Sequence, residues 1–312
     1  MSDNESPERG ALERLLLAHL TEQRRSRRWS VFFKSLGIVW LFLVLGMILS
    51  YEGDDFASTG PHTALVEING EIGGEGGISA DALIGALSGA FEDKHTQGVV
   101  LRINSPGGSP VQAGQVYDEI RRLRGKYPKI PLYVVVDDIC ASGGYYIAAA
   151  ADRIFVDKAS LVGSIGVLMD GFGFTDVMKK MGVERRLLTA GENKGFLDPF
   201  SPVDPNQEAH ALTMLGEVHK QFIQVVRQGR GKRLKETPDM FSGLVWSGAR
   251  SIELGLADAL GSLDYVAREV IKAEDVVDFT PQEGLAERLA RRIGTSMGQA
   301  MGPWAKENLR VR

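Results

Sequence analysis

The residues with the clearest chemical potential lie between an apolar segment and a run of small residues. Ser142 follows the apolar segment 132–136 and is itself followed by Gly143 and Gly144. Glycines let the backbone approach a ligand closely, and the first amides of a helix are free to donate hydrogen bonds. A serine at this position can act as a nucleophile with an anion-stabilising amide beside it. The same residues also fit a serine that only caps a helix.

A second glycine turn precedes this one in the chain. Residues 104–108 are Asn-Ser-Pro-Gly-Gly and follow a strand predicted at 98–103. Paired glycines at the end of a strand can present N–H groups to a developing negative charge, as an oxyanion hole requires, although the composition is also that of an ordinary turn. Because the carboxyl ends of parallel strands meet at one edge of a sheet, we expect both turns at that edge.

Ser142 needs a base to remove its proton. A lysine can serve if burial or its neighbours lower its pKa, since the neutral amine then accepts the proton. Lys194 is the candidate, in a loop of small and apolar residues, whereas Glu192 and Asp198 would favour a charged, solvated lysine. Both interpretations of Lys194 stay open on the residues alone. The histidines lie outside the glycine-rich loops, at positions 19, 62, 95, 210 and 219.

The composition argues against several classes of function. The chain has 312 residues, 44% hydrophobic and 24% charged, with a net charge of −4, so no basic surface points to nucleic acid. One cysteine and five histidines show no metal-ligand spacing, and we expect neither a metal nor a cofactor. Cys140, two residues before Ser142, is expected to be a small buried apolar residue rather than a nucleophile.

Alternating strand and helix signals predict the scaffold that positions these residues. This alternation indicates an α/β domain of βαβ units with a largely parallel sheet. Small residues after Ser142 predict a helix across 143–151. Strands are predicted at 64–68, 98–103, 132–136, 153–156 and 185–188, and helices after Ser79 and at 111–124, 174–181, 205–227 and 249–254.

Residues 29–51 are predicted to cross a membrane as an uncleaved signal anchor. Lys34 is their only charge, and about 20 apolar residues match a hydrocarbon core of roughly 30 Å. Arginines precede the segment and acidic residues follow it, so the N-terminus should be cytoplasmic. A cleaved signal peptide is the alternative. The expected parts are a cytoplasmic tail (1–28), the anchor (29–51), a linker (52–62), a periplasmic catalytic domain (63–274) and a C-terminal tail (275–312) with a helix at 285–293.

Several motifs, in this order, resemble one family. The region 64–272 is similar to the S49 peptidases, in the short bacterial form of signal peptide peptidase A. That resemblance implies a ClpP/crotonase-like fold of repeated βαβ units, preceded here by the transmembrane helix. The matching motifs are Arg-Ile-Asn-Ser-Pro-Gly-Gly-Ser (102–109), Cys-Ala-Ser-Gly-Gly-Tyr-Tyr-Ile-Ala (140–148), Gly-Ser-Ile-Gly-Val (163–167), Gly-Glu-Asn-Lys-Gly (191–195), and Val-Trp-Ser-Gly (245–248) with Gly-Leu-Ala-Asp (255–258).

The resemblance also implies roles for individual residues. Ser142 would be the nucleophile and Lys194 the general base, with Ser164 as a hydroxyl that orients the lysine. The amides of Gly108 and Gly143 would form the oxyanion hole. The family's long members carry two domain copies with serine and lysine in different copies, so a single copy implies that Lys194 reaches Ser142 of a neighbouring protomer. By analogy with the short members, the expected assembly is an octameric ring.

The expected activity is that of a serine endopeptidase in the bacterial inner membrane. It would degrade cleaved signal peptides and other apolar or unfolded peptides. Two other classes stay open: a crotonase-like acyl-CoA hydrolase or isomerase, which also uses paired amides, and a non-catalytic membrane scaffold. An external domain argues against the first, because coenzyme A is cytosolic.

Overall fold

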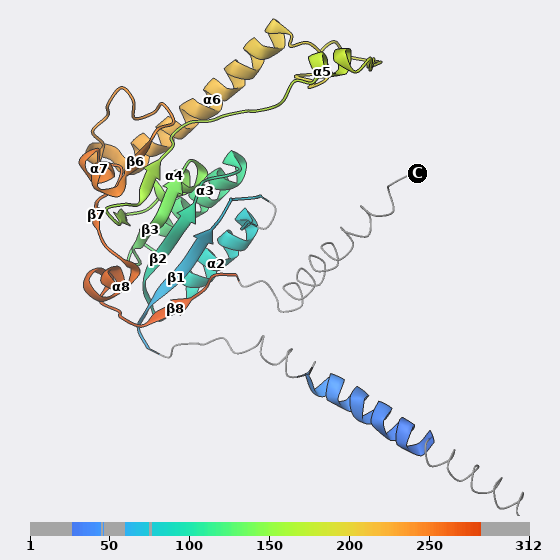
Figure 1. Cartoon of the computed structure of the whole chain (residues 1–312). Helices are drawn as coiled ribbons and strands as arrows, with labels where there is room; N and C mark the ends of the chain where they lie inside the picture. The colour runs from blue at the N-terminus through green and yellow to red at the C-terminus, as the bar shows by residue number, and fades with distance from the viewer. Residues whose placement is uncertain (1–26, 45, 47–59, 75–76, 282–312) are drawn as a thin grey trace, which may run out of the picture. The chain divides into compact units, whose positions relative to one another are not determined.

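The computed structural model describes residues 27–44, 46, 60–74 and 77–281. The chain divides into two units, one of which contains residues 57–281. In the other unit, residues 27–44 form a helix (Figure 1, blue). No helix within the described ranges has both the length and the apolar character needed to span a bilayer. The end of the predicted anchor 29–51 lies outside those ranges, as do most of the linker and the predicted helix 285–293.

One mainly parallel sheet forms the centre of unit 57–281, which confirms the predicted α/β class. β1 (His62–Asn69), β2 (Thr96–Ser105) and β3 (Leu132–Ala141) run parallel to one another. Beside the end of β3 lies β5 (Leu161–Gly163), which β6 (Val245–Ser247) pairs antiparallel. The remaining strands, paired in parallel, are β4 (Arg153–Val156) beside β3, β7 (Ala259–Leu260) beside β4, and β8 (Val276–Asp278) beside β1.

The main layer of helices covers one face of this sheet (Figure 1). Alternate strand residues point to opposite faces, so Val66, Leu101 and Val134 are buried on the helical side while Val100 and Val135 pack on the other. The helical side carries α2 (Ala80–Glu92), α3 (Pro110–Lys126) and α4 (Gly143–Ala148), and the other side carries α8 (Leu263–Tyr265) and the π-helix η2 (Val266–Ile271).

The helix after Ser142 is shorter than predicted, because it ends at Ala148 rather than continuing to residue 151. The alanines that follow it contact another helix. α6 (Pro205–Arg230) approaches them so closely that a β-carbon on Gly229 would lie 1.9 Å from the carbonyl oxygen of Ala149. The small-residue run therefore makes room for a helix contact as well as starting a helix.

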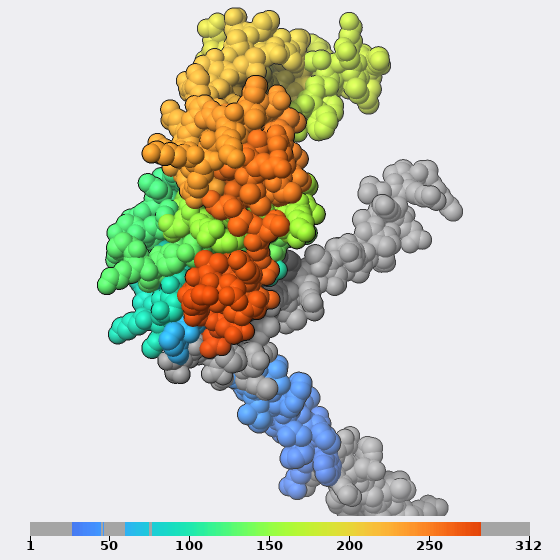
Figure 2. Space-filling model, turned by 90° about the vertical axis from the view of Figure 1, so that its left-hand side faces the viewer, coloured from blue at the N-terminus to red at the C-terminus, as the bar shows by residue number. Residues whose placement is uncertain are grey.

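α6 extends beyond the sheet (Figure 1). Its C-terminal half packs on α4, where the Phe222 ring lies 5.1 Å from that of Tyr146. Its N-terminal half and α5 (Thr175–Lys180) form an outlying part that we call the arm, residues 168–214. Figure 2 shows its yellow-green segment standing clear of the rest of the domain.

The strand predicted at 185–188 is wrong, since these residues form neither strand nor helix. Apolar leucines suggested a strand, but Leu188 is 95% exposed. Within the described residues no strand runs beside the segment to complete a ladder, and an isolated strand is not stable in water. The helix predicted at 249–254 is present as α7 (Gly248–Glu253), which directly follows β6. The 3₁₀ helix η1 (Gly231–Arg233), which follows α6, was not predicted.

Candidate active site

Ser142 occupies a strained turn between β3 and α4. Its backbone has φ 50° and ψ −120°, a conformation that side-chain-bearing residues rarely adopt. Such strain costs about 1–3 kcal/mol and persists only when the surroundings enforce it. Here the Ser142 N–H donates to the Gly163 carbonyl at 2.9 Å, and the Ser142 carbonyl accepts from the Tyr146 N–H at 2.9 Å. The side chain makes no capping bond to α4, so Ser142 is not an ordinary helix cap.

The glycine turn at 104–108 lies directly against Ser142. A β-carbon on Gly107 would be 2.7 Å from the Ser142 β-carbon and 2.9 Å from the Gly143 nitrogen. A β-carbon on Gly143 would be 3.4 Å from the Gly108 nitrogen. The ends of β2 and β3 therefore bring both glycine turns to one edge of the sheet. Only residues without side chains can approach this closely.

The amides of Gly108 and Gly143 are free to donate. Neither is hydrogen-bonded to an acceptor in the part of the chain that the structure describes. Gly143 begins α4, and the first N–H groups of a helix have no acceptor within it. Two free donors beside a serine can stabilise a tetrahedral oxyanion formed on that serine.

Ser164 repeats the geometry of Ser142 one strand away. It also has φ 50°, and its N–H donates to the Leu244 carbonyl at 2.8 Å. β3 and β5 pair with Ala141 opposite Gly163, so the two serines follow directly paired residues. Paired strands are roughly 4.8 Å apart. A second half-buried serine therefore stands next to Ser142.

Lys194 lies in a loop fastened to the start of α6. Its own N–H donates to the Gly191 carbonyl at 3.1 Å, and its side chain is exposed. The Leu197 N–H donates to the Gln207 side chain at 3.0 Å, and the Phe196 ring meets His210 edge-on at 5.8 Å. These contacts hold the Lys194 loop against the first turns of α6.

Within the described residues of the protomer, no hydrogen bond joins Lys194 to Ser142. The region of Ser142 meets α6 much further along the helix, where His219 Nε2 lies 3.1 Å from the Ile165 carbonyl oxygen. From Gln207 to His219 the helix advances twelve residues, a rise of roughly 18 Å. The Lys194 loop is therefore held at the start of α6, whereas the segment that follows Ser164 contacts the helix three turns later.

Asp198, which could have held Lys194 charged, is occupied by other partners. It accepts from the Ser201 hydroxyl at 2.6 Å and pairs with Arg185 at 2.6 Å. The Ser201 hydrogen bond, the Phe200 amide and the Arg185 charge hold the pKa of Asp198 below its ordinary value. Asp198 is therefore already paired with other groups, which weakens the argument that it binds Lys194.

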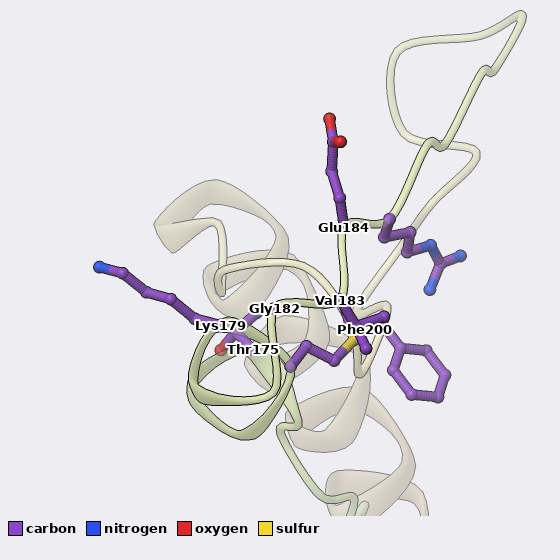
Figure 3. Close-up of a pocket in the computed structure, with 8 residues that line it drawn as sticks. Thr175, Lys179, Gly182, Val183, Glu184 and Phe200 are labelled. Atoms are coloured by element: carbon purple, nitrogen blue, oxygen red, sulfur yellow. The ribbon is translucent and has the colours of Figure 1, made fainter.

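The arm has a pocket of its own, with a volume of about 410 Å³. In Figure 3 the long side chains of Lys179 and Glu184 point outward from it. Phe200 forms one wall, and the Arg185 guanidinium lies 5.2 Å from its ring. None of the predicted site residues is among the residues that line this pocket, which are Thr175, Met178, Lys179, Gly182, Val183, Glu184, Arg185 and Phe200.

Cys140 is placed as a buried residue rather than as a nucleophile. Cys140 is fully buried, and burial raises the pKa of its thiol, which disfavours the reactive thiolate. Across the described ranges no group of three His, Cys, Asp or Glu residues is placed to hold a metal ion.

Two residues that the sequence pattern did not single out shape the glycine turn. The fully buried Ser105 accepts from the Gly107 N–H at 3.2 Å. Ile72, also fully buried, donates its N–H to the Gly107 carbonyl at 2.8 Å and accepts from the Ser109 N–H at 2.9 Å. Ser105 belongs to the motif itself and could have been considered, whereas nothing in the sequence connects Ile72 to the turn.

Comparisons with known proteins give matches to peptidases. Residues 125–277 match the model of peptidase family S49. The chain is 29% identical over 238 residues to a putative protease of Methanocaldococcus jannaschii, covering 73% of this chain and 76% of the relative. It is 29% identical over 189 residues to a putative signal peptide peptidase SppA of Enterococcus faecium, covering 61% and 54%.

A further relative carries a different name. The chain is 42% identical over 222 residues to a protein named Na(+)/H(+) antiporter NhaA from Brucella melitensis, covering 71% of this chain and 30% of that protein. The chain thus spans less than a third of the length of that relative.

Proposed function

Because this chain belongs to peptidase family S49, we propose that it is a serine endopeptidase whose nucleophile is Ser142. The observation that carries the proposal is the packing of Ser142 against the 104–108 turn, with the free amides of Gly108 and Gly143 beside it. Membership of a peptidase family favours this activity over acyl-CoA chemistry and over a non-catalytic scaffold.

The chemistry follows from these positions. A neutral Lys194 amine takes the proton from the Ser142 hydroxyl as its oxygen attacks the peptide carbonyl carbon. The resulting oxyanion accepts hydrogen bonds from the amides of Gly108 and Gly143. The lysine then gives the proton to the leaving amine and later activates the water that hydrolyses the acyl-enzyme. The Ser164 hydroxyl, one strand from Ser142, hydrogen-bonds the lysine and orients it.

Lys194 is supplied by a second copy of the chain in a homo-oligomeric ring. Supporting this, the rise along α6 places Gln207, which holds the Lys194 loop, roughly 18 Å from His219, which contacts Ile165 near Ser164. The arm also exposes large apolar side chains, including Leu168 at 80% and Phe172 at 78%. A neighbouring copy would cover them while receiving the lysine. The ring of eight rests on the family resemblance.

The protein is anchored in the bacterial inner membrane, with the catalytic domain in the periplasm. Residues 29–51 would form the anchor, and their described part exposes large apolar side chains such as Phe33 and Trp40. Its substrates are cleaved signal peptides and other apolar or unfolded chains. A single-pass anchor would hold the sites beside the membrane where such peptides are released.

The test is cleavage of an unfolded protein by detergent-solubilised variants. Ser142→Ala and Lys194→Ala should each lower kcat by a factor on the order of 10³ or more, because each removes a group that acts in bond breaking. Lys180→Ala is the matched control, since it removes another lysine of the arm and should leave cleavage unchanged. Wild-type-like activity in Lys194→Ala would end the dyad, and activity in Ser142→Ala would end the assignment of the nucleophile.

A further inference from the structure

The peptide group between Gly107 and Gly108 is held in place from outside the turn. Its carbonyl oxygen accepts from the Ile72 N–H at 2.8 Å and from the Ser105 hydroxyl at 3.4 Å. The same hydroxyl oxygen accepts from the Gly107 N–H at 3.2 Å. Among the described residues, Ser105 is the one whose side chain hydrogen-bonds to the backbone of residues 106–108.

The orientation of this peptide group decides whether Gly108 can serve the reaction. In a trans peptide the carbonyl and the N–H point in opposite directions. Holding the Gly107 carbonyl toward Ile72 and Ser105 therefore turns the Gly108 N–H the other way, and a β-carbon on Gly143 would lie 3.4 Å from that nitrogen.

The turn does not fix this orientation by itself. Gly107 and Gly108 have φ of 116° and 140°, values that glycine adopts readily because it has no β-carbon. The same lack of side chains lets the peptide group between the two glycines rotate. A rotated peptide would direct a carbonyl oxygen, rather than an N–H, toward the oxyanion. The hydrogen bonds from Ile72 and Ser105 oppose that rotation.

We propose that Ser105 is a positioning residue, whose buried hydroxyl holds the Gly107–Gly108 peptide with the Gly108 N–H directed at the oxyanion. The inference rests on the proposed function, because Ser105 itself touches neither substrate nor nucleophile. It predicts an effect confined to the tetrahedral state. Substrate binding in the ground state does not use the oxyanion donors at full strength.

The experiment compares Ser105→Ala with the wild type in full-length, detergent-solubilised protein. We expect kcat for a peptide substrate to fall at least about tenfold with KM unchanged, a fraction of the loss seen when an oxyanion donor is removed. Affinity for a peptide boronate, which forms a tetrahedral adduct on the serine, should fall by a similar factor. A merely structural role would lower the melting temperature without this split between kcat and KM.

Ser109→Ala is the matched control. Its hydroxyl accepts from the Gln112 N–H at 3.4 Å and caps α3 without contacting the 107–108 peptide. Its kcat and boronate affinity should stay within about twofold of the wild type.

Unchanged kcat and boronate affinity in folded Ser105→Ala would overturn the inference while leaving the proposed function intact. Cleavage by Ser142→Ala would overturn both. If Ser105→Ala does not fold, Ser105→Cys takes its place, because sulfur is a similarly placed but weak acceptor. A wild-type kcat in that variant would equally overturn the inference.

Discussion

At the scale of one residue, Gly108 packs so closely against the backbone of Ile72 that a side chain has no room there. A β-carbon there would lie 2.2 Å from the carbonyl oxygen of Ile72, in a conformation with φ 140°. An added methyl group must push either Ile72 or the turn away. Since the Gly108 N–H is a proposed oxyanion donor, the displacement would affect the chemistry directly.

We expect Gly108→Ala to lower kcat by a factor on the order of 10². Gly114→Ala is the matched control, because a β-carbon on this α3 glycine would contact nothing within 4 Å. It should stabilise the helix by about 0.5–1 kcal/mol and leave kcat unchanged. Steady-state kinetics and thermal unfolding of both variants check the pair. Full activity in Gly108→Ala would exclude Gly108 as a donor.

Residues of the site were predictable where their signal is local in the chain. Ser142, Gly143 and Gly108 stand out because serine and paired glycines follow apolar strands. Ile72 gives no such signal, since its hydrogen bonds to the turn exist only after β1 and β2 have paired. The strain at Ser142 and Ser164 was equally hidden, because nothing in a Gly-Ser or Ala-Ser sequence specifies a φ of 50°.

At the scale of elements, a buried ion pair fastens the end of α6 to the body of the domain. Arg230 is 1% exposed, and its guanidinium lies 2.9 Å from Asp258 and donates to the Gly255 carbonyl at 2.8 Å. Asp258 also accepts from the Ile154 N–H at 2.7 Å. Burial alone would raise the pKa of Asp258, but its hydrogen bonds and the charge of Arg230 bring the pKa below its ordinary value.

This lowered pKa gives the ion pair a defined dependence on pH. A carboxyl group whose pKa is lower in the folded chain contributes stability above its unfolded pKa, near 4, and loses it as the pH falls through the folded value. Asp258→Asn should cost roughly 3–5 kcal/mol at pH 7, because it leaves Arg230 buried without an anion. As the pH is lowered from 5, the free energy of unfolding should fall less in this variant than in the wild type, because the variant has no carboxyl group to protonate at this position.

Thermal unfolding measured from pH 7 down to acid checks this prediction. Glu253→Gln is the control, since its pair with Arg250 is exposed and should contribute less than about 1 kcal/mol. Equal destabilisation by the two substitutions would contradict the assignment of Arg230 and Asp258 as the fastening of α6.

Most elements were predictable because their patterns reflect burial on one face. Strands β1 to β4 and the helices α2, α3 and α6 follow from apolar periodicity and from caps such as Ser79, which accepts from the Ala82 N–H. The strands β5 to β8, of two or three residues each, were not predicted. The structure of segment 185–188 was not predicted correctly. Its leucines give the apolar pattern of a strand, but they lie on the arm, where no described strand pairs with them. The local sequence of the arm does not indicate what its apolar residues pack against.

At the scale of the whole molecule, the arm separates the two proposed halves of the catalytic dyad. Sequence alone could place Lys194 and Ser142 in one mechanism only through the family resemblance. The folded chain adds a physical reason to test a shared site, since the Lys194 loop is held at Gln207 and the segment after Ser164 contacts α6 twelve residues later, at His219. Oligomerisation would then be part of catalysis rather than a means of packing inert copies together.

Mixing two inactive variants tests this account most directly. Purified Ser142→Ala and Lys194→Ala would be combined under conditions that let protomers exchange, and cleavage of an unfolded protein would be measured against each variant alone. If sites are shared, some mixed interfaces join an intact Ser142 to an intact Lys194, and partial activity should return. No recovery, once exchange has been verified with labelled protomers, would contradict a dyad formed between two copies of the chain.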